Sequence, residues 1–367
     1  MIGIIDADLL TRKKHRFPNL ASMKISGYCK TRGENTRLVL SYDEDLQQYE
    51  KIFISKVFTD TEVPEGILSM NNVEHGGTGF FYDKAPQLSA EIEHSRPDYS
   101  LYDEFVEKLK KAGSRHSELK HYTDYSIGFL TRKCFRGCNF CVNRNFKAVE
   151  TGSTLEEFLD PERKKICLLD DNFLGAKNWE KLLEDLIQTG KPFKFVQGLD
   201  ERLLTPRKCE LLFSANYDGE ITFAFDNIAD AALIEEKLEL IRSHSLKEVK
   251  FYILSGYNPK NDQAPEFWKR DISSIFERIA LLAKYKALPY IMRHADYLAS
   301  PYRGIYITIG RWANQPGLYR NLSLNQFIDK ATEAGEKAPA KYREELLKDF
   351  PELAKYFERI YEKEARP

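Results

Sequence analysis

The chain has 367 residues, and its 55 basic and 56 acidic side chains leave a formal charge of −1. That length favours two domains, or one domain with an extension. The balanced charge gives no support to nucleic-acid binding over the whole surface. No apolar run approaches the roughly 20 residues that span a bilayer, and the first residues lack the basic and apolar regions of a signal peptide. We therefore expect a cytoplasmic protein without a membrane partner.

The N-terminal third has the pattern of a small α/β domain. Its short apolar strands are predicted at Ile2–Ile5, Arg37–Leu40 and Lys51–Phe58. A helix follows Pro18-Asn19, and this order predicts a parallel sheet of the Rossmann type. The glycine-rich stretch His75–Gly79 lacks the spacing of a phosphate-binding loop, so we expect a tight turn there. Residues 83–121 are predicted to be a connector with one helix, Tyr102–Lys111.

From residue 121 onward, apolar strands alternate with amphipathic helices. The six strands are predicted at Tyr125–Leu130, Lys165–Asp170, Phe193–Gln197, Ile221–Phe225, Val249–Leu254 and Pro289–Met292. The helices between them are predicted at Trp179–Ile187, Ala231–Ile241 and Ile272–Tyr285. Six such repeats predict an α/β fold with an open (β/α)6 barrel, three-quarters of a TIM barrel. Residues 311–316 are predicted to be a loop, and a helical tail is predicted at Ala340–Glu364.

Three segments follow from this pattern. Residues 1–120 form the Rossmann-like domain with its connector, residues 121–310 form the barrel, and residues 311–367 form a C-terminal extension. Active sites of such barrels lie at the carboxyl ends of the strands. The residues that follow each strand are therefore the ones to examine for chemistry.

Three of the six cysteines lie within eight residues, directly after the first strand of the predicted barrel. Cys134, Cys138 and Cys141 have the spacing C-x3-C-x2-C. Thiolates select zinc, copper(I) or iron–sulfur clusters, and a structural zinc site usually has four protein ligands. Three cysteines on one loop suit a [4Fe–4S] cluster with one iron left open. A zinc site or a purely structural cluster is the alternative, and Cys167 is expected to be a buried small hydrophobe.

The spacing, with Phe140 before the last cysteine, resembles the CxxxCxΦC signature of the radical S-adenosylmethionine (SAM) superfamily. The resemblance implies that Cys134, Cys138 and Cys141 bind a [4Fe–4S] cluster and that Phe140 packs near the adenine of SAM. It implies reductive cleavage of SAM to a 5′-deoxyadenosyl radical, which abstracts hydrogen from a substrate. The electron would come from a reductant such as flavodoxin or ferredoxin. The substrate class stays open between a small molecule, a nucleotide and a peptide.

Polar residues also follow the later strands, and together they predict a polar pocket at the barrel mouth that binds the cofactor. They are Gln197, Asp200, Asp226 and Ser255. Asp200 with Arg202 is equally explained as a structural ion pair. At the second strand, the resemblance assigns Asp170 or Asp171 to the ammonium group of SAM, and a helix N-cap is the structural alternative. No residue is assigned a catalytic role.

The N-terminal domain resembles that of the cobalamin-dependent branch of this superfamily. Many members of the branch carry Asp-x-His-x-x-Gly, whose histidine binds cobalt, whereas this chain has Asp6-Ala7-Asp8. We therefore expect no cobalamin, and a cobalamin-dependent methyltransferase is the second hypothesis. A zinc- or cluster-stabilised scaffold without activity is the third. Short stretches such as Gly76–Gly79 and Gln197–Asp200 are also similar to uncharacterised bacterial and phage-type radical SAM proteins.

Overall fold

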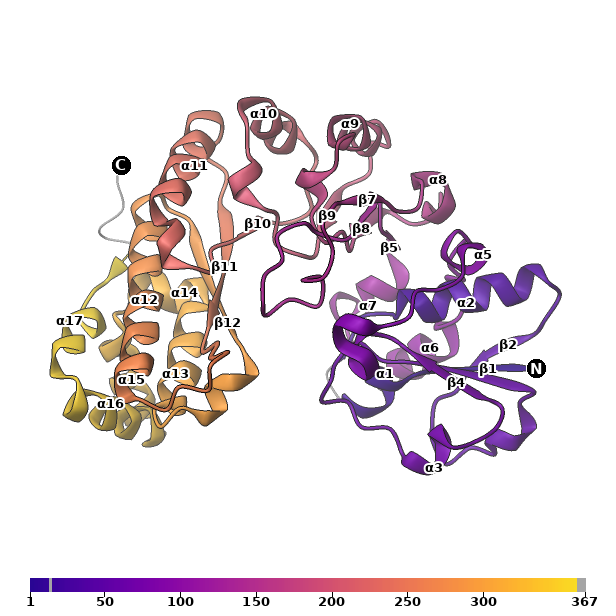
Figure 1. The fold of residues 1–367 in the computed structure, drawn as a ribbon, viewed down its shortest axis with the longest axis horizontal. Helices are drawn as coiled ribbons and strands as arrows, with labels where there is room; N and C mark the ends of the chain where they lie inside the picture. Colours follow the sequence, from indigo (N-terminus) through magenta and orange to yellow (C-terminus); the bar gives the residue numbers. More distant parts are fainter. Residues whose placement is uncertain (13–14, 362–367) are drawn as a thin grey trace. The chain divides into compact units, whose positions relative to one another are not determined.

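The computed structural model describes residues 1–12 and 15–361, which divide into two compact units (Figure 1). The first comprises Met1–Lys177 and Asp185–Lys194, and the second comprises Asn178–Glu184 and Phe195–Pro367. The division passes through helix α9 (Trp179–Gln188) and strand β9 (Phe193–Phe195). Two units are a coarser division than the three predicted segments, and the boundaries after residues 120 and 310 stay predictions.

The first unit begins with a four-stranded parallel sheet in the order β2-β1-β3-β4. Its strands are β1 (Ile2–Asp6), β2 (Thr36–Leu38), β3 (Lys51–Ser55) and β4 (Val73–Gly76). Every residue of β1 is buried, because apolar side chains cover both faces of the sheet. Met23 and Leu119 belong to the cluster on one face, and Leu46 and Ile67 to the cluster on the other. The predicted parallel α/β sheet is confirmed, and β4 is an addition to it.

The short helices of this part connect the strands and cover the sheet. They are α1 (Ala7–Thr11), α2 (Leu20–Thr31), α3 (Glu65–Leu68), α4 (Thr78–Phe81), α5 (Ala90–Glu93), α6 (Asp103–Lys111) and α7 (His116–Thr123), with 3-10 turns at Leu46–Gln48 and Tyr82–Lys84. The prediction of a connector with one helix was wrong. Leu119 and Tyr122, three residues apart on α7, are buried in the core, and that packing stabilises a helix whose sequence is mostly polar.

The second sheet of the first unit has the order β5-β8-β9. Strands β5 (Tyr125–Gly128) and β8 (Lys165–Leu168) are parallel, with Ile127 opposite Cys167. Cys167 is fully buried, as predicted. Between these strands, β6 (Thr131–Arg132) and β7 (Glu150–Thr151) form an antiparallel pair, followed by α8 (Leu155–Phe158) and, after β8, a 3-10 turn at Phe173–Gly175. The pair closes the base of a long loop that carries the three cysteines.

The second unit holds a parallel sheet in chain order, β10 (Ile221–Ala224), β11 (Val249–Ser255) and β12 (Leu288–Arg293). Helix α10 (Pro206–Ser214) and a 3-10 turn at Glu201–Leu203 precede the sheet in the sequence. Helices α11 (Ala231–His244) and α12 (Pro265–Lys284) lie between its strands, with a 3-10 turn at Ile228–Asp230. A parallel bridge joins Leu199 to Phe223. All six predicted strands are present, in two three-stranded sheets. Their closure into a partial barrel stays a prediction.

The C-terminal part is helical. It contains a 3-10 turn at Ala295–Ala299 and the helices α13 (Arg303–Ala313), α14 (Pro316–Asn321), α15 (Leu324–Glu333), α16 (Ala338–Asp349) and α17 (Ala354–Phe357). The loop predicted at residues 311–316 was wrong, because α13 continues to Ala313 and Pro316 opens α14 at its first turn, where proline is favoured. The predicted tail helix ends early, before Pro351. Its residues 362–364 lie outside the described part.

Trp312 accounts for the continuation of α13. Its side chain is fully buried, and its ring lies 5.4 Å from that of Tyr319 and 5.9 Å from that of Tyr361. Its indole N–H donates to the carbonyl of Leu322 at 3.0 Å. Among the helices that the structure describes, none is long and apolar enough to cross a membrane.

We expect Trp312→Ala to lower the free energy of unfolding by about 3–5 kcal/mol, because the change leaves a cavity and an unpaired carbonyl. Urea unfolding measures the effect. Leu246→Ala serves as the control, because Leu246 is 91% exposed and its loss should change little. A Trp312→Ala variant as stable as the control would contradict the packing described for α13.

Candidate functional site

The cysteine loop leaves β5 through a short turn and is closed at its base by β6 and β7. Thr131 pairs with Thr151 and Arg132 with Glu150. At the first residue of the loop, the ammonium of Lys133 lies 2.7 Å from the carboxylate of Glu150. Lys133 has φ of +70°, a conformation that costs free energy for a residue with a side chain. The chain therefore enters the loop through a defined and strained turn.

Tight turns place the three cysteines close along the loop. The amide of Cys141 donates to the carbonyl of Cys138 at 2.9 Å, and the amide of Arg144 donates to the carbonyl of Cys141 at 3.2 Å. Gly137, with φ of +61°, makes the turn between the first two cysteines, and this conformation favours glycine. All three cysteines are half-buried and form no disulfide.

Nitrogen donors point at two of the sulfur atoms. The amide of Arg136 lies 3.4 Å from Cys134 Sγ, and the amide of Asn143 lies 3.4 Å from Cys141 Sγ. The side-chain amide of Asn172 donates to Cys134 Sγ at 3.3 Å. Donors of this kind stabilise thiolates and tune the potential of an iron–sulfur cluster. The loop therefore fits a thiolate-bound cofactor.

Within residues 1–12 and 15–361, no three His, Cys, Asp or Glu side chains are gathered tightly enough to hold one metal ion. A single zinc ion needs its thiolates about 2.3 Å from one point. A [4Fe–4S] cluster instead binds each thiolate at a different iron. The absence of such a group among the described residues concerns a site for one metal ion, and it does not test a [4Fe–4S] cluster.

The two acidic residues after β8 hold the start of the cysteine loop. Asp170 Oδ1 accepts the amide of Thr131 at 2.6 Å and its hydroxyl at 2.7 Å, and Oδ2 accepts the amide of Leu130 at 3.2 Å. Asp171 Oδ2 accepts the amide of Lys133 at 2.7 Å. The following 3-10 turn has Asn172 at its N-cap, without a side-chain cap bond. Both carboxylates therefore tie the end of β8 to the backbone that leads into Cys134.

Asp170 is 3% exposed, and burial raises its pKa to about 7, opposed by the donors from Thr131 and Leu130. Its three accepted hydrogen bonds use most of the acceptor capacity of a carboxylate. Asp171 is half-buried. Of the two residues assigned to the SAM ammonium, Asp171 thus keeps more freedom to meet a ligand. Phe140, also half-buried, lies in the same unit, and its carbonyl accepts the hydroxyl of Tyr82.

The other predicted site residues belong to the second unit. Gln197 is exposed. The carboxylate of Asp200 lies 2.7 Å from the guanidinium of Arg202, which is the ion pair that the sequence left as an alternative. Next to it, Glu201 is 2% exposed and accepts the amide of Ala224 at 3.2 Å. Burial, with the charge of Asp200, raises the pKa of Glu201 to about 8.

Asp226 and Ser255 lie at the ends of neighbouring strands of the second unit. Asp226 Oδ1 accepts the amide of Leu254 at 3.3 Å, and Ser255 Oγ donates to the carbonyl of Met292 at 3.2 Å. Arg278 from α12 is buried beneath them and donates one guanidinium nitrogen to the carbonyls of Phe225, Asp226 and Leu254, at 2.9–3.1 Å. This cation gathers the ends of β10 and β11.

The structure therefore brings Cys134, Cys138, Cys141, Phe140, Asp170 and Asp171 together on one unit and places Gln197, Asp200, Asp226 and Ser255 on the other. His294, which follows β12, accepts the amide of Asp296 at 3.3 Å. Sequence reasoning missed the contacts of Tyr82, Asn172 and Arg278. Asn172 directly follows Asp170 and Asp171, and this position could have indicated it, but nothing local marked Tyr82 or Arg278.

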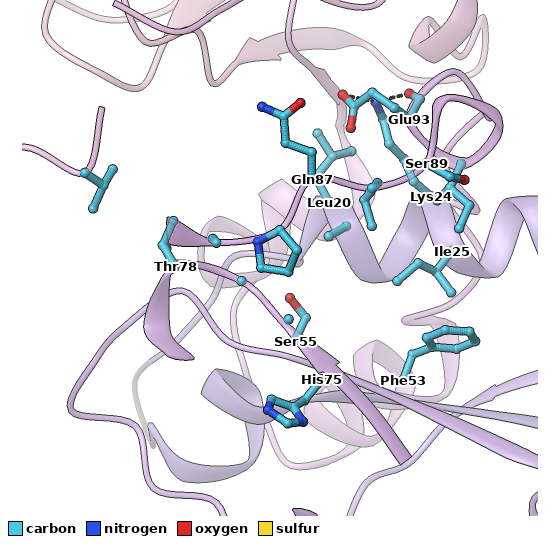
Figure 2. Close-up of a pocket in the computed structure, with 18 of the residues that line it drawn as sticks. Leu20, Lys24, Ile25, Phe53, Ser55, His75, Thr78, Gln87, Ser89 and Glu93 are labelled. Carbon is cyan, nitrogen blue, oxygen red and sulfur yellow. Dashed lines mark hydrogen bonds and ion pairs between the residues drawn. The ribbon is translucent and has the colours of Figure 1, made fainter. Parts of the chain in front are cut away.

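A pocket of about 540 Å³ lies in the first unit where β3 and β4 end (Figure 2). Ser55 and Gly76, the last residues of these strands, line it. Figure 2 shows Lys24 of α2 paired with Glu93 at the top of the view, and their charged atoms lie 2.9 Å apart. Arg132, Val142, Asn143 and Phe146 complete the lining from the base and the tip of the cysteine loop. The pocket thus adjoins the loop.

No protein-family model matches the chain. Two solved structures of TsrM, a radical S-adenosylmethionine methyltransferase from Kitasatospora setae, are similar to it. The structure with cobalamin and a [4Fe-4S] cluster bound has a TM-score of 0.51 and 12% identity, over 80% of this chain and 71% of that one. The structure with tryptophan substrate and a SAM analogue bound has a TM-score of 0.51 and 12% identity, over 79% and 72%. At this identity, the likeness shows a shared fold.

We expect Glu201→Gln to stabilise the apoprotein at neutral and higher pH. In the wild type, the unfolded chain ionises Glu201 above about pH 4.5, while the folded chain keeps it protonated up to about pH 8. Stability is therefore lost as pH rises through this interval. The variant keeps an oxygen for the amide of Ala224. It should match the wild type at pH 4 and exceed it by on the order of 2 kcal/mol at pH 8.

Urea unfolding at both pH values measures this difference. The exposed Glu344→Gln is the control, and it should shift neither value. A Glu201→Gln variant less stable than the wild type at pH 8 would show that the folded chain needs the charged carboxylate.

Proposed function

We propose that this chain is a radical SAM enzyme that abstracts hydrogen from a substrate still to be identified. The observation that carries the proposal is the cysteine loop. Three cysteines with the CxxxCxΦC spacing follow β5, and nitrogen donors point at the sulfur atoms of Cys134 and Cys141. The fold shared with a radical SAM methyltransferase supports it. The substrate is a small molecule, a nucleotide or a peptide.

Cys134, Cys138 and Cys141 would hold a [4Fe–4S] cluster, and its remaining iron would be open to the amino and carboxylate groups of SAM. When bound, the cluster supplies the electron that cleaves SAM to methionine and a 5′-deoxyadenosyl radical, after reduction by a partner such as flavodoxin or ferredoxin. Asp171 would accept the SAM ammonium, and Phe140 would pack beside the adenine. The assignment of Gln197, Asp200, Asp226 and Ser255 to the binding of SAM stays a prediction from the sequence.

The chain's own part in this chemistry is to orient and to neutralise. Asn172 and the loop amides donate to the sulfurs and spread their negative charge. Arg132 stacks on the ring of Phe129, with its guanidinium carbon 3.9 Å from the ring centre, beside the base of the loop. A fixed positive charge there favours an anionic cofactor.

Anaerobic reconstitution with iron and sulfide, followed by dithionite and SAM, tests the proposal. We expect about four irons and four sulfides per chain in the wild type and formation of 5′-deoxyadenosine, measured by mass spectrometry. Cys138→Ala should lose this product by more than about 100-fold, because one cluster ligand is gone. Cys29→Ala, which removes a buried cysteine outside the loop, should keep both. Zinc in place of iron and sulfide would favour the scaffold hypothesis and overturn the proposal.

A cobalamin-dependent methyltransferase is the second candidate, and the pocket beside the cysteine loop favours it. Its volume lies in the range of small-molecule sites, and one of the similar TsrM structures binds cobalamin. Asp8 stands where the branch often has its cobalt-binding histidine. Its carboxylate accepts the amide of Val57 at 2.7 Å and the hydroxyl of Thr61 at 2.5 Å. A corrinoid would therefore bind without that ligand.

Filling the pocket tests this candidate. A side chain added at Gly76 meets no atom within 4 Å, so Gly76→Val should fold normally and occupy the space at the end of β4. We expect the wild type to retain hydroxocobalamin through gel filtration, with its visible absorbance, and Gly76→Val to retain at least about ten-fold less. Gly317→Val, at an equally open glycine of α14, is the control. A wild type that retains no corrinoid would overturn the cobalamin-dependent candidate, and the first candidate would remain.

A further inference from the structure

The segment Tyr82–Asp83, which follows α4, contacts the tip of the cysteine loop. The hydroxyl of Tyr82 donates to the carbonyl of Phe140 at 2.8 Å, across 58 residues of sequence. Phe140 stands between Cys138 and Cys141, and its carbonyl belongs to the peptide group that carries the amide of Cys141. That amide in turn donates to Cys138. The tyrosine hydroxyl thus fixes the peptide group between two of the three cysteines.

Asp83 holds the other side of Cys141. Its Oδ2 accepts Nε of Arg144 at 2.8 Å and the side-chain amide of Asn145 at 2.9 Å. Arg144 also donates from Nη1 to the carbonyl of Asn139 at 3.2 Å. The side chain of Asp83 is only 9% exposed, so this ion pair is shielded from water on the carboxylate side. One carboxylate and one guanidinium thereby connect both flanks of the last cysteine.

The backbone at Tyr82 is strained. It has φ of +50° and ψ of −117°, in a region that residues with a side chain rarely adopt. Four residues other than glycine have positive φ among the described residues, and two of them, Tyr82 and Lys133, contact or begin the cysteine loop. Strain of this kind persists where the surroundings over-determine the conformation.

Tyr82 and Asp83 also line the pocket described above. They contribute to its wall, together with Val142 and Asn143, which directly follow Cys141. The segment therefore lies between the pocket and the cysteine loop. A shift of Tyr82 or Asp83 would move the backbone of this part of the loop. That backbone includes the amide of Asn143, which donates to Cys141 Sγ.

We propose that Tyr82 and Asp83 form a clamp that positions the cysteine loop for its iron–sulfur cluster. The proposal rests on the proposed function. Tyr82 and Asp83 act through residues 138–145 of the loop as positioning residues. Because hydrogen bonds to the sulfurs help to set the potential of a cluster, the clamp sets that potential and the rate at which the loop releases iron.

Tyr82→Phe and Asp83→Asn separate this role from a general contribution to stability. Tyr82→Phe removes the hydroxyl bond to Phe140, Asp83→Asn removes the charge that pairs with Arg144, and both keep the shape of the side chain. The matched controls are Tyr302→Phe, which loses a hydroxyl bond of 2.6 Å to Asp349, and Glu336→Gln, which loses a carboxylate 2.8 Å from Arg311. Both controls lie far along the chain from the loop, in the second unit.

The reconstituted full-length protein supplies two readouts, the midpoint potential of the cluster by redox titration with electron paramagnetic resonance, and the rate of iron transfer to a chelator. We expect both clamp variants to release iron at least about five-fold faster than the wild type and to shift the potential and the spectrum. The controls should match the wild type in potential, spectrum and iron release. In the apoprotein, amides of residues 138–146 should exchange hydrogen faster in the clamp variants only.

The outcomes distinguish the two proposals. A wild type that assembles no iron–sulfur cluster overturns both. A wild type with a cluster, together with clamp variants that match it in potential, spectrum and iron release, overturns the clamp alone. Circular dichroism of each apoprotein establishes folding. If Tyr82→Phe does not fold, Asp83→Asn decides, since it keeps the shape of the side chain and removes only its charge.

Discussion

The carboxylate of Asp170 is the contact on which the position of the cysteine loop depends. It stands at the end of one strand and accepts both amides of the turn that leaves the neighbouring strand, together with the Thr131 hydroxyl. These groups lie where water does not reach them. Without an acceptor, each buried amide would cost more than its hydrogen bond contributes. An apolar side chain could not replace this carboxylate, although burial disfavours its charged form.

The loop is restrained at its base and at its tip. Asp170 and Asp171 fix its base from β8, while Tyr82 and Asp83 contact its tip from the segment after α4. Ordering one residue of a flexible loop costs about 1–2 kcal/mol of conformational entropy. A loop that is already ordered spares a bound cofactor much of that cost. This is the physical reason for so many contacts to a segment that packs little apolar surface.

The second unit meets a similar constraint with the opposite charge. The carboxyl ends of β10 and β11 direct several carbonyl oxygens toward one place, and the buried guanidinium of Arg278 donates to three of them. Asp226 and Asp271 lie near enough to oppose the effect of burial on this cation. In the first unit, the carboxylates of Asp170 and Asp171 accept hydrogen bonds from backbone amides. In the second unit, the guanidinium of Arg278 donates hydrogen bonds to backbone carbonyls. Both arrangements satisfy backbone groups that strand ends leave unpaired.

Local pattern predicted much of this chain, because strand alternation, helix periodicity and cysteine spacing are written in neighbouring residues. It identified the six later strands and the cysteine loop. Prediction from local pattern failed where contacts with residues outside the segment determine its structure. Trp312 stands in a stretch of polar and proline residues that resembles a loop, and only burial against Tyr319 and Tyr361 keeps it helical.

The same limit applies to the site. Cysteine spacing predicts which atoms can bind a cluster, since ligands on one loop are close in sequence. The groups that hold the loop come from elsewhere, because a loop without a hydrophobic core cannot order itself. Tyr82 lies 58 residues before its partner, and Arg278 lies 52 residues after Asp226. Around neither residue does the sequence differ from that of an ordinary surface helix or turn, so only the three-dimensional contacts reveal them.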